Sequence, residues 1–176
     1  MPIKLSQVVS LVSGTSVLIV LGSLYTFGAL MPYLSSYLYY KGHSVSKDAL
    51  TVVFTITIVM LNVGMPLGSF LSHRLSNRVI SMISVTSLSA VVLITSFMTD
   101  FITIIIFYGI LNGLAIGLGY IAPVKNAYTH FQDRKGFAAG VCMSGFGFGS
   151  VIFNYILVFL INPNNEKIDH DTKHFP

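Results

Sequence analysis

The stretch FITIIIFYGILNGLAIGLGYIAPV, residues 101–124, contains no Asp, Glu, Lys or Arg. A helix rises about 1.5 Å per residue, so about 20 apolar residues cross the hydrocarbon core of a bilayer. Helices of soluble proteins average about 11 to 12 residues and keep a polar face. The stretch therefore predicts a membrane-spanning helix. The tight turn before it, at Thr99 and Asp100, predicts an antiparallel neighbour.

Four more stretches lack charged residues, and each has at least 21 residues. They cover residues 5–40, 49–72, 79–99 and 136–165. Only 9% of the residues are charged, whereas soluble domains average about 25%. The sequence therefore predicts an all-α integral membrane protein with about five transmembrane helices in residues 1–161. A polar C-terminal tail, residues 162–176, is expected to follow.

The expected spans lie near residues 8–30, 49–71, 79–98, 101–122 and 136–161. Pro32 is expected after the first span and Pro123 at the end of the fourth. In the predicted loops, six Lys and Arg residues lie on the side of the N-terminus and four on the other side. The positive-inside rule then predicts a cytoplasmic N-terminus and a C-terminus on the opposite side. Because these charges form no basic stripe, no nucleic-acid partner is expected.

Small residues recur at four-residue spacing in the fourth and fifth spans. The glycines selected on this basis are Gly109, Gly113, Gly117, Gly145 and Gly149. Small residues at positions i and i+4 let two helix backbones approach closely in lipid. The pattern predicts packing contacts between helices, and it is also compatible with contacts that slide during transport.

Uncharged polar side chains within the predicted spans include Tyr25, Asn62, Asn112 and Tyr120. Such groups usually hydrogen-bond to a neighbouring helix, and a minority line a water-filled path, so both interpretations stay open. No acidic residue lies deep in a span, so no carboxylate proton relay is expected. Lys125 is expected to extend to the cytoplasmic headgroups, with an anion contact as the alternative.

Nothing in the chain is typical of an enzyme. The glycine-rich stretch at residues 144–150 lacks the strand and the Lys-Ser/Thr pair of a nucleotide site. His170 and His174 have a spacing that can bind Zn²⁺ on a helix, but they lie in the polar tail. The sequence therefore predicts no catalytic residues, no metal and no cofactor.

Three stretches of the sequence form recognisable motifs. They are GSLYTFG at residues 22–28, MPLGSFLSHRLSNR at residues 65–78, and GLGY at residues 117–120 followed by HFQDRKG at residues 130–136. With these motifs the chain resembles the N-terminal part of a major facilitator superfamily transporter. Among the branches of that superfamily, it is most similar to the oxalate/formate antiporters and the monocarboxylate transporters.

The resemblance implies a carrier with twelve spans in two halves, each half built from inverted three-helix repeats, with the solute between the halves. The five predicted spans would belong to the first half. The resemblance also implies a signature loop after the second span, here with Gly68, His73, Arg74 and Arg78. His73 stands where the family has an acidic residue, and Ser76 stands where it has a glycine.

The leading hypothesis is transport of small solutes, monocarboxylate-like or other small organic anions, by a partial major facilitator transporter. In this hypothesis Tyr25, Asn62, Asn112 and Tyr120 face the solute cavity, and the motifs favour the two tyrosines. The alternative is a truncated paralogue without transport, or a membrane subunit that packs against other chains through its glycines. The expected partners are the lipid bilayer, a small organic solute, and a missing second half or another membrane chain.

Overall fold

A computed structural model describes residues 5–42, 45 and 47–163. Five helical segments in this part of the chain are long and apolar enough to cross a membrane. They cover Leu5–Tyr40, Asp48–Leu71, Asn77–Ser96, Phe101–His130 and Gln132–Ile161. The predicted all-α fold with several membrane spans is confirmed.

Three of the five spans change helix type along their length. The first consists of α1 (Leu5–Leu21), the 3-10 turn η1 (Gly22–Tyr25) and α2 (Thr26–Tyr40). The second and third are α3 (Lys47–Leu71) and α4 (Asn77–Ser96). The fourth consists of α5 (Phe101–Ile104), the π-helical segment η2 (Ile105–Asn112) and α6 (Gly113–His130). The 3-10 turn η3 (Gln132–Arg134) then leads into α7 (Lys135–Ile161).

Two prolines lie inside helices, where the sequence had suggested helix ends. Pro32 is within α2, which continues to Tyr40, and Pro123 is within α6, which continues to His130. A proline removes one backbone donor and disturbs one helical hydrogen bond. In lipid, unpaired backbone groups have no water to bind, so continuing the helix past a proline leaves fewer of them than ending it.

Polar side chains cap the N-terminal ends of two helices, α4 and α5. The Ser76 hydroxyl accepts a hydrogen bond from the Val79 amide at 3.4 Å, ahead of α4. The Asp100 carboxylate accepts from the amide and the hydroxyl of Thr103 at 3.1 and 3.0 Å, ahead of α5. Such caps satisfy amides that have no partner in the first turn of a helix.

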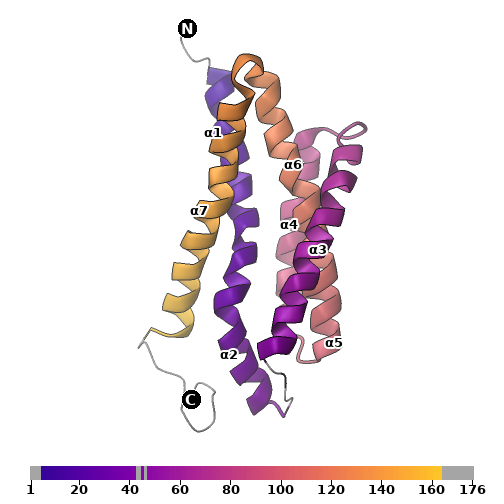
Figure 1. The fold of residues 1–176 in the computed structure, drawn as a ribbon, viewed down its shortest axis with the longest axis vertical. Coiled ribbons are helices and arrows are strands. Elements are labelled where there is room, and N and C mark those ends of the chain that lie inside the picture. The colour runs from indigo at the N-terminus through magenta and orange to yellow at the C-terminus, as the bar shows by residue number, and fades with distance from the viewer. Residues whose placement is uncertain (1–4, 43–44, 46, 164–176) are drawn as a thin grey trace.

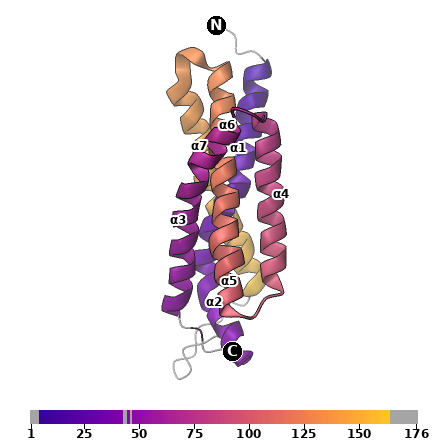
Figure 2. The ribbon, with the colours of Figure 1, turned by 90° about the vertical axis from the view of Figure 1, so that its right-hand side faces the viewer.

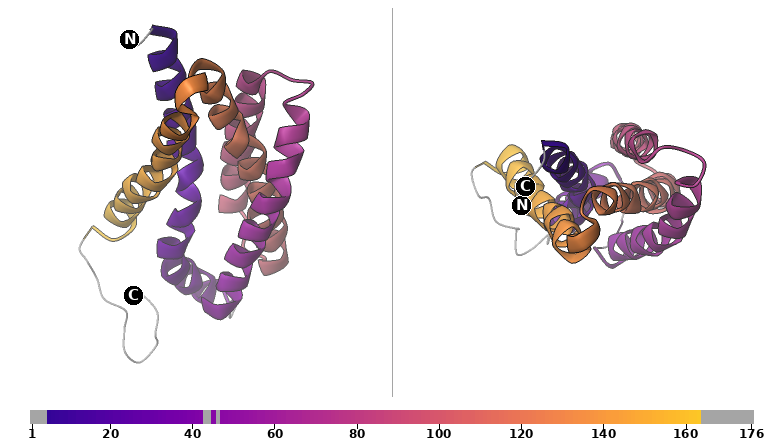
Figure 3. Two further views of the ribbon diagram at one scale, coloured as in Figure 1. Left: turned by 45° about the horizontal axis from the view of Figure 1, so that its top comes forward. Right: turned by 90° about the horizontal axis from the view of Figure 1, so that it is seen from above.

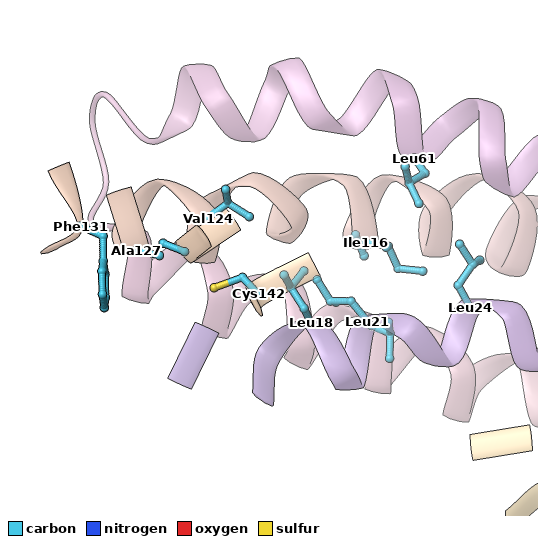
Figure 4. Packing of buried hydrophobic residues seen from close by; sticks show 12 residues of the cluster. Leu18, Leu21, Leu24, Leu61, Ile116, Val124, Ala127, Phe131 and Cys142 are labelled. Atoms are coloured by element: carbon cyan, nitrogen blue, oxygen red, sulfur yellow. The ribbon is translucent and has the colours of Figure 1, made fainter. Parts of the chain in front are cut away.

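The spans form one elongated bundle in which α1 begins at one end and α7 ends at the other (Figure 1). This arrangement follows from an odd number of crossings. α6 is the central helix and packs against α1, α3 and α4 (Figure 2), while α7 packs mainly along α1 (Figure 3). Leu18, Ile116 and Cys142, from α1, α6 and α7, are fully buried in the core between these helices (Figure 4).

Glycines bring α3 and α6 into backbone contact, which we call the α3–α6 contact. A Cβ atom on Gly113 would lie 2.5 Å from the Thr57 carbonyl oxygen. One on Gly117 would lie 2.8 Å from Cα of Gly64, and Gly68 meets the backbone of Leu118 in the same way. Only glycine fits at these positions, because carbon atoms normally pack 3.5–4.0 Å apart.

A second set of glycines brings α7 against the first span, which we call the α1–α7 contact. A Cβ atom on Gly145 would lie 2.7 Å from the Thr15 carbonyl oxygen, and one on Gly149 would overlap the backbone of Ile19. Gly22 lies equally close to the carbonyl of Phe146. In both contacts the residue numbers rise together along the two helices, so each contact joins a parallel pair.

Candidate functional site

Aromatic side chains from four elements meet around Phe146 of α7, and we call this group the aromatic site. The rings of Tyr25 and Phe146 lie 5.5 Å apart at 74°, and those of Tyr120 and Phe146 lie 5.1 Å apart at 90°. Phe54 of α3 extends the group, with its ring 6.3 Å from that of Tyr25. Edge-to-face packing of this kind is the favoured geometry for aromatic pairs.

The backbone of the first span explains why these rings meet. Gly22 has no side chain and lets η1 approach the Phe146 carbonyl, and Tyr25 follows at the end of the same turn. Tyr25 remains 45% exposed, whereas Tyr120 and Phe146 are partly buried against the core. Tyr120 and Phe146 therefore form the packed inner part of the aromatic site, and Tyr25 lies on its exposed side.

Asn62 lies on the same side of α3 as the aromatic site, further along the helix. Phe54, Ile58 and Asn62 follow one another at four-residue spacing, which keeps them on one side of a helix. The Asn62 side chain is exposed, and its amide nitrogen donates to the Ile58 carbonyl at 2.8 Å. Helical periodicity thus places Asn62 on the side of α3 that carries Phe54, whose ring contacts that of Tyr25.

Asn112 lies apart from these three residues. It is only 2% exposed and lines a separate cavity of about 250 Å³, together with Thr26, Tyr108 and residues of α4 and α7. Its Oδ1 atom has no hydrogen-bond partner among the described residues. The four polar residues selected from the sequence therefore belong to two different places in the fold.

The aromatic site itself is uncharged, and a basic residue lies beyond it on α6. Lys125 follows Tyr120 by five residues, a rise of about 7.5 Å along the helix. Its ammonium donates to the hydroxyls of Ser69 and Ser72 at 2.8 and 2.7 Å and to the Ser69 carbonyl at 3.3 Å. Lys125 therefore ties α6 to the end of α3, and its expected extension to the headgroups stays a prediction.

Of the four signature-loop residues, one is buried against a neighbouring helix and three are exposed. Gly68 is buried, and a Cβ atom there would lie 2.9 Å from Cα of Leu118. His73, Arg74 and Arg78 are exposed, in the turn after α3 and at the start of α4. Their cationic and imidazole groups are thus available for contacts outside the described part of the chain.

Gly64, Phe54 and Phe146 are among the contact and site residues that were not selected from the sequence. Gly64 could have been found, since Gly64 and Gly68 have the same four-residue spacing as the glycines of the fourth span. Phe54 and Phe146 carry no such signal, because any phenylalanine in a span is equally compatible with lipid contact.

The expectation that the chain holds no metal stays a prediction. The described residues include no group of three or more His, Cys, Asp or Glu side chains that could hold a metal ion. The expected weak candidates, His170 and His174, lie outside the described residues.

Comparison with known proteins gives a family match over most of the chain. Residues 15–164 match the model of the Major Facilitator Superfamily. The Apicoplast pyruvate carrier 1 of Toxoplasma gondii is 26% identical over 89% of this chain and 35% of its own length. Monocarboxylate transporter 12 of Rattus norvegicus is 33% identical over 54% of this chain and 20% of its own length.

A bacterial protein is also similar. The uncharacterized MFS-type transporter YhjX of Escherichia coli is 27% identical over 77% of this chain and 33% of its own length. The chain therefore spans about a third or less of the length of these relatives.

Proposed function

The chain belongs to the major facilitator superfamily, a family of membrane transporters and not of enzymes, and from this premise we propose that it forms one wall of a path for small organic anions. The solutes are monocarboxylate-like, and the aromatic site contacts them. The observation that carries the proposal is the meeting of Tyr25, Phe146 and Tyr120 on an open face of the bundle.

The chemistry of the aromatic site suits a small planar solute. Aromatic edges carry partial positive charge and pack well against flat groups, and a phenol hydroxyl can donate a hydrogen bond to a carboxylate. The names of the relatives, a pyruvate carrier and a monocarboxylate transporter, support the same class of solute. The aromatic site carries no charge, so in this proposal groups outside these residues balance most of the negative charge of the solute.

Transport in this proposal needs no bond chemistry. A solute drives the change between two conformations only by binding one of them more tightly. The path runs between this bundle and a second group of helices, as in other proteins built from inverted repeats. The N-terminus is cytoplasmic in this proposal, because six of the ten Lys and Arg residues lie toward that end of the spans.

Uptake of radiolabelled pyruvate into proteoliposomes that contain the complete natural gene product tests the proposal. We expect Tyr120→Ala to lower the initial rate by about two- to tenfold, since an aromatic contact is worth about 0.5–1.5 kcal/mol. Tyr155→Ala is the matched control, because Tyr155 is 76% exposed on α7 and takes no part in the aromatic site. Equal losses in the two variants would contradict the proposal.

A second candidate function is a membrane subunit without transport activity. The observation that favours it is the signature loop, in which His73 and Ser76 replace the acid and the glycine of the family pattern. The same uptake assay separates the two candidates, because a saturable flux by the unmodified protein contradicts a purely structural role.

A further inference from the structure

Lys125 of α6 carries a positive charge near the end of the bundle where α1 begins, and its hydrogen-bond partners among the described residues are all neutral. Its ammonium donates to the hydroxyls of Ser69 and Ser72 and to the Ser69 carbonyl. An ammonium has three N–H donors, so these contacts use each of them once. The hydrogen bonds are satisfied, but none of these partners brings an opposite charge.

The acidic residues that the structure describes lie elsewhere. Asp48 and Asp100 lie at the starts of α3 and α5, at the opposite end of the bundle, and Asp133 is exposed beyond the end of α6. Lys125 itself is only partly exposed. A charge that is partly withdrawn from water is costly unless an opposite charge balances it. This position therefore favours an anion that comes from outside the described part of the chain.

The two serines beside Lys125 allow an anion to enter without leaving a polar group unpaired. The bond from the ammonium to the Ser69 carbonyl is the longest of the three at 3.3 Å, and this carbonyl also accepts from the Ser72 hydroxyl at 2.6 Å. If a carboxylate oxygen took the place of the Ser69 carbonyl, that carbonyl would keep the Ser72 hydroxyl as its donor. A hydrogen bond between two charged groups is also shorter and stronger than one to a neutral carbonyl.

The Ser69 hydroxyl offers a second donor to the same anion. It accepts from Lys125 at 2.8 Å and donates to none of the described residues. A hydroxyl both accepts and donates, so its own hydrogen is available for an acceptor. The ammonium and this hydroxyl together can therefore contact the two oxygens of one carboxylate.

One side of α3 connects this position with the aromatic site. Phe54, Asn62 and Ser69 are separated by eight and seven residues, and both spacings return close to the same side of a helix. Phe54 contacts Tyr25 of the aromatic site, and Ser69 lies about 22 Å further along the helix axis. A solute anion that moves from the aromatic site toward this end of the bundle therefore reaches a cation at Lys125.

From these observations we propose that Lys125 and Ser69 form a second binding position for the solute, between the aromatic site and the end of the bundle where α1 begins. The ammonium binds one carboxylate oxygen, and the Ser69 hydroxyl donates to the other. This inference rests on the proposed function and adds to it a group of this chain that balances the charge of the solute. The aromatic site contacts the planar part of the solute, and the second position sets the preference for an anion over a neutral analogue.

Inhibition of radiolabelled pyruvate uptake tests this preference in proteoliposomes that contain the complete natural gene product. Unlabelled pyruvate is compared with pyruvamide, which has a similar shape but no charge. We expect Lys125→Gln to lower the ratio of the pyruvamide to the pyruvate inhibition constant by about tenfold, the effect of losing a hydrogen bond between charged groups. Lys125→Arg should keep most of the preference, because it keeps the charge.

The ratio separates binding from a purely structural role of Lys125. Loss of the tie between α6 and α3 would weaken both inhibitors equally and leave the ratio unchanged. Arg134→Gln is the matched control, because Arg134 is an exposed basic residue at the same end of the bundle. It should also leave the ratio unchanged.

Thiol labelling tests the same position without transport. In a Cys142→Ala background of the complete gene product, Met65→Cys places a thiol one helical turn from Ser69 on the same side of α3. The probes are an anionic and a neutral methanethiosulfonate, and Lys125→Gln should lower the ratio of their rates by about threefold or more. Phe70→Cys is the control, because Phe70 is 64% exposed and points about 140° away from Met65 around the helix. Its ratio should not change.

The possible results distinguish this inference from the proposed function. Saturable pyruvate uptake with an unchanged ratio of inhibition constants in Lys125→Gln would overturn the second binding position and leave the proposed function intact. Absence of uptake by the unmodified protein would contradict the proposed function, and an unchanged labelling ratio at Met65→Cys would then overturn the anion position as well. A Lys125 effect on labelling in phosphatidylcholine vesicles that disappears when they contain phosphatidylglycerol would assign Lys125 to lipid headgroups, and so overturn its role in binding the solute.

Discussion

The α3–α6 and α1–α7 contacts use the same device, glycine against backbone in a parallel helix pair, but they differ in how firmly they are held. Both contacts have glycines on both sides, Gly64 against Gly117 and Gly22 against Gly149, but Lys125 also closes the α3–α6 contact at one end through Ser69 and Ser72. In the α1–α7 contact, the Thr15 hydroxyl donates to the Val141 carbonyl over a longer distance, 3.5 Å.

Burial distinguishes α6 from α7. Of the most apolar stretch of the fourth span, 39% of the residues are buried, compared with 11% for the fifth span. The comparison suggests that α3 and α6 form the fixed part of the bundle. The α1–α7 contact carries the pair Tyr25 and Phe146, so the aromatic site lies on the contact that can adjust more easily.

The largest effect is expected from Gly117→Ala in the α3–α6 contact. The added Cβ atom would overlap the Leu61 carbonyl and lie 2.8 Å from Cα of Gly64, and α6 is enclosed by other helices and cannot move away. We expect a loss of about 1–3 kcal/mol in the free energy of unfolding, measured in mixtures of detergent and SDS. Gly147→Ala is the control, because a Cβ atom there would meet nothing within 4 Å. An equal effect of the two substitutions would refute the close contact.

A smaller effect is expected from Gly149→Ala in the α1–α7 contact. The new Cβ atom would overlap the backbone of Ile19, but α7 can shift outward because its opposite face is exposed. We expect a loss of about 1 kcal/mol in the same assay. A loss larger than that of Gly117→Ala would reverse the order of the two contacts.

The smallest effects are expected from two threonines that occupy matching places in the contacts. Thr57 donates to the Val53 carbonyl at 2.9 Å and lies 3.3 Å from the Tyr108 carbonyl of the neighbouring segment, and it is fully buried. Thr57→Val should therefore cost about 0.6 kcal/mol in the free energy of unfolding. Thr15→Val should cost less, because its bond to the Val141 carbonyl is long. Equal losses in the free energy of unfolding for the two variants would contradict the expected difference between these two hydrogen bonds.

The sequence predicts the spans well, because a run without charge is a local property of the chain. It does not predict how far a helix continues past a proline, since Pro32 and Pro123 are accommodated by the surrounding fold. The glycine pattern indicates close packing, but the partner of each glycine depends on which helices become neighbours.

The position of Asn112 shows what polarity alone does not predict. Asn112 directly precedes α6, and Tyr120 lies eight residues later in the same regular helix. At 3.6 residues per turn the two side chains point about 80° apart around the helix axis, toward different parts of the bundle. The aromatic site could not be predicted from the sequence either, because its rings come together only through the approach of Gly22 to Phe146.

The central claim, that the open face around Phe146 contacts the solute, is tested most directly by thiol labelling. In a Cys142→Ala background of the complete natural gene product, Phe146→Cys is labelled with a water-soluble maleimide, with and without pyruvate. Phe148→Cys is the matched control, since Phe148 lies two residues away and is 65% exposed on the outer face of α7. We predict that pyruvate slows labelling at position 146 by about threefold or more and leaves position 148 unchanged. Labelling at position 146 that does not respond to pyruvate, or an equal response at both positions, would contradict the claim.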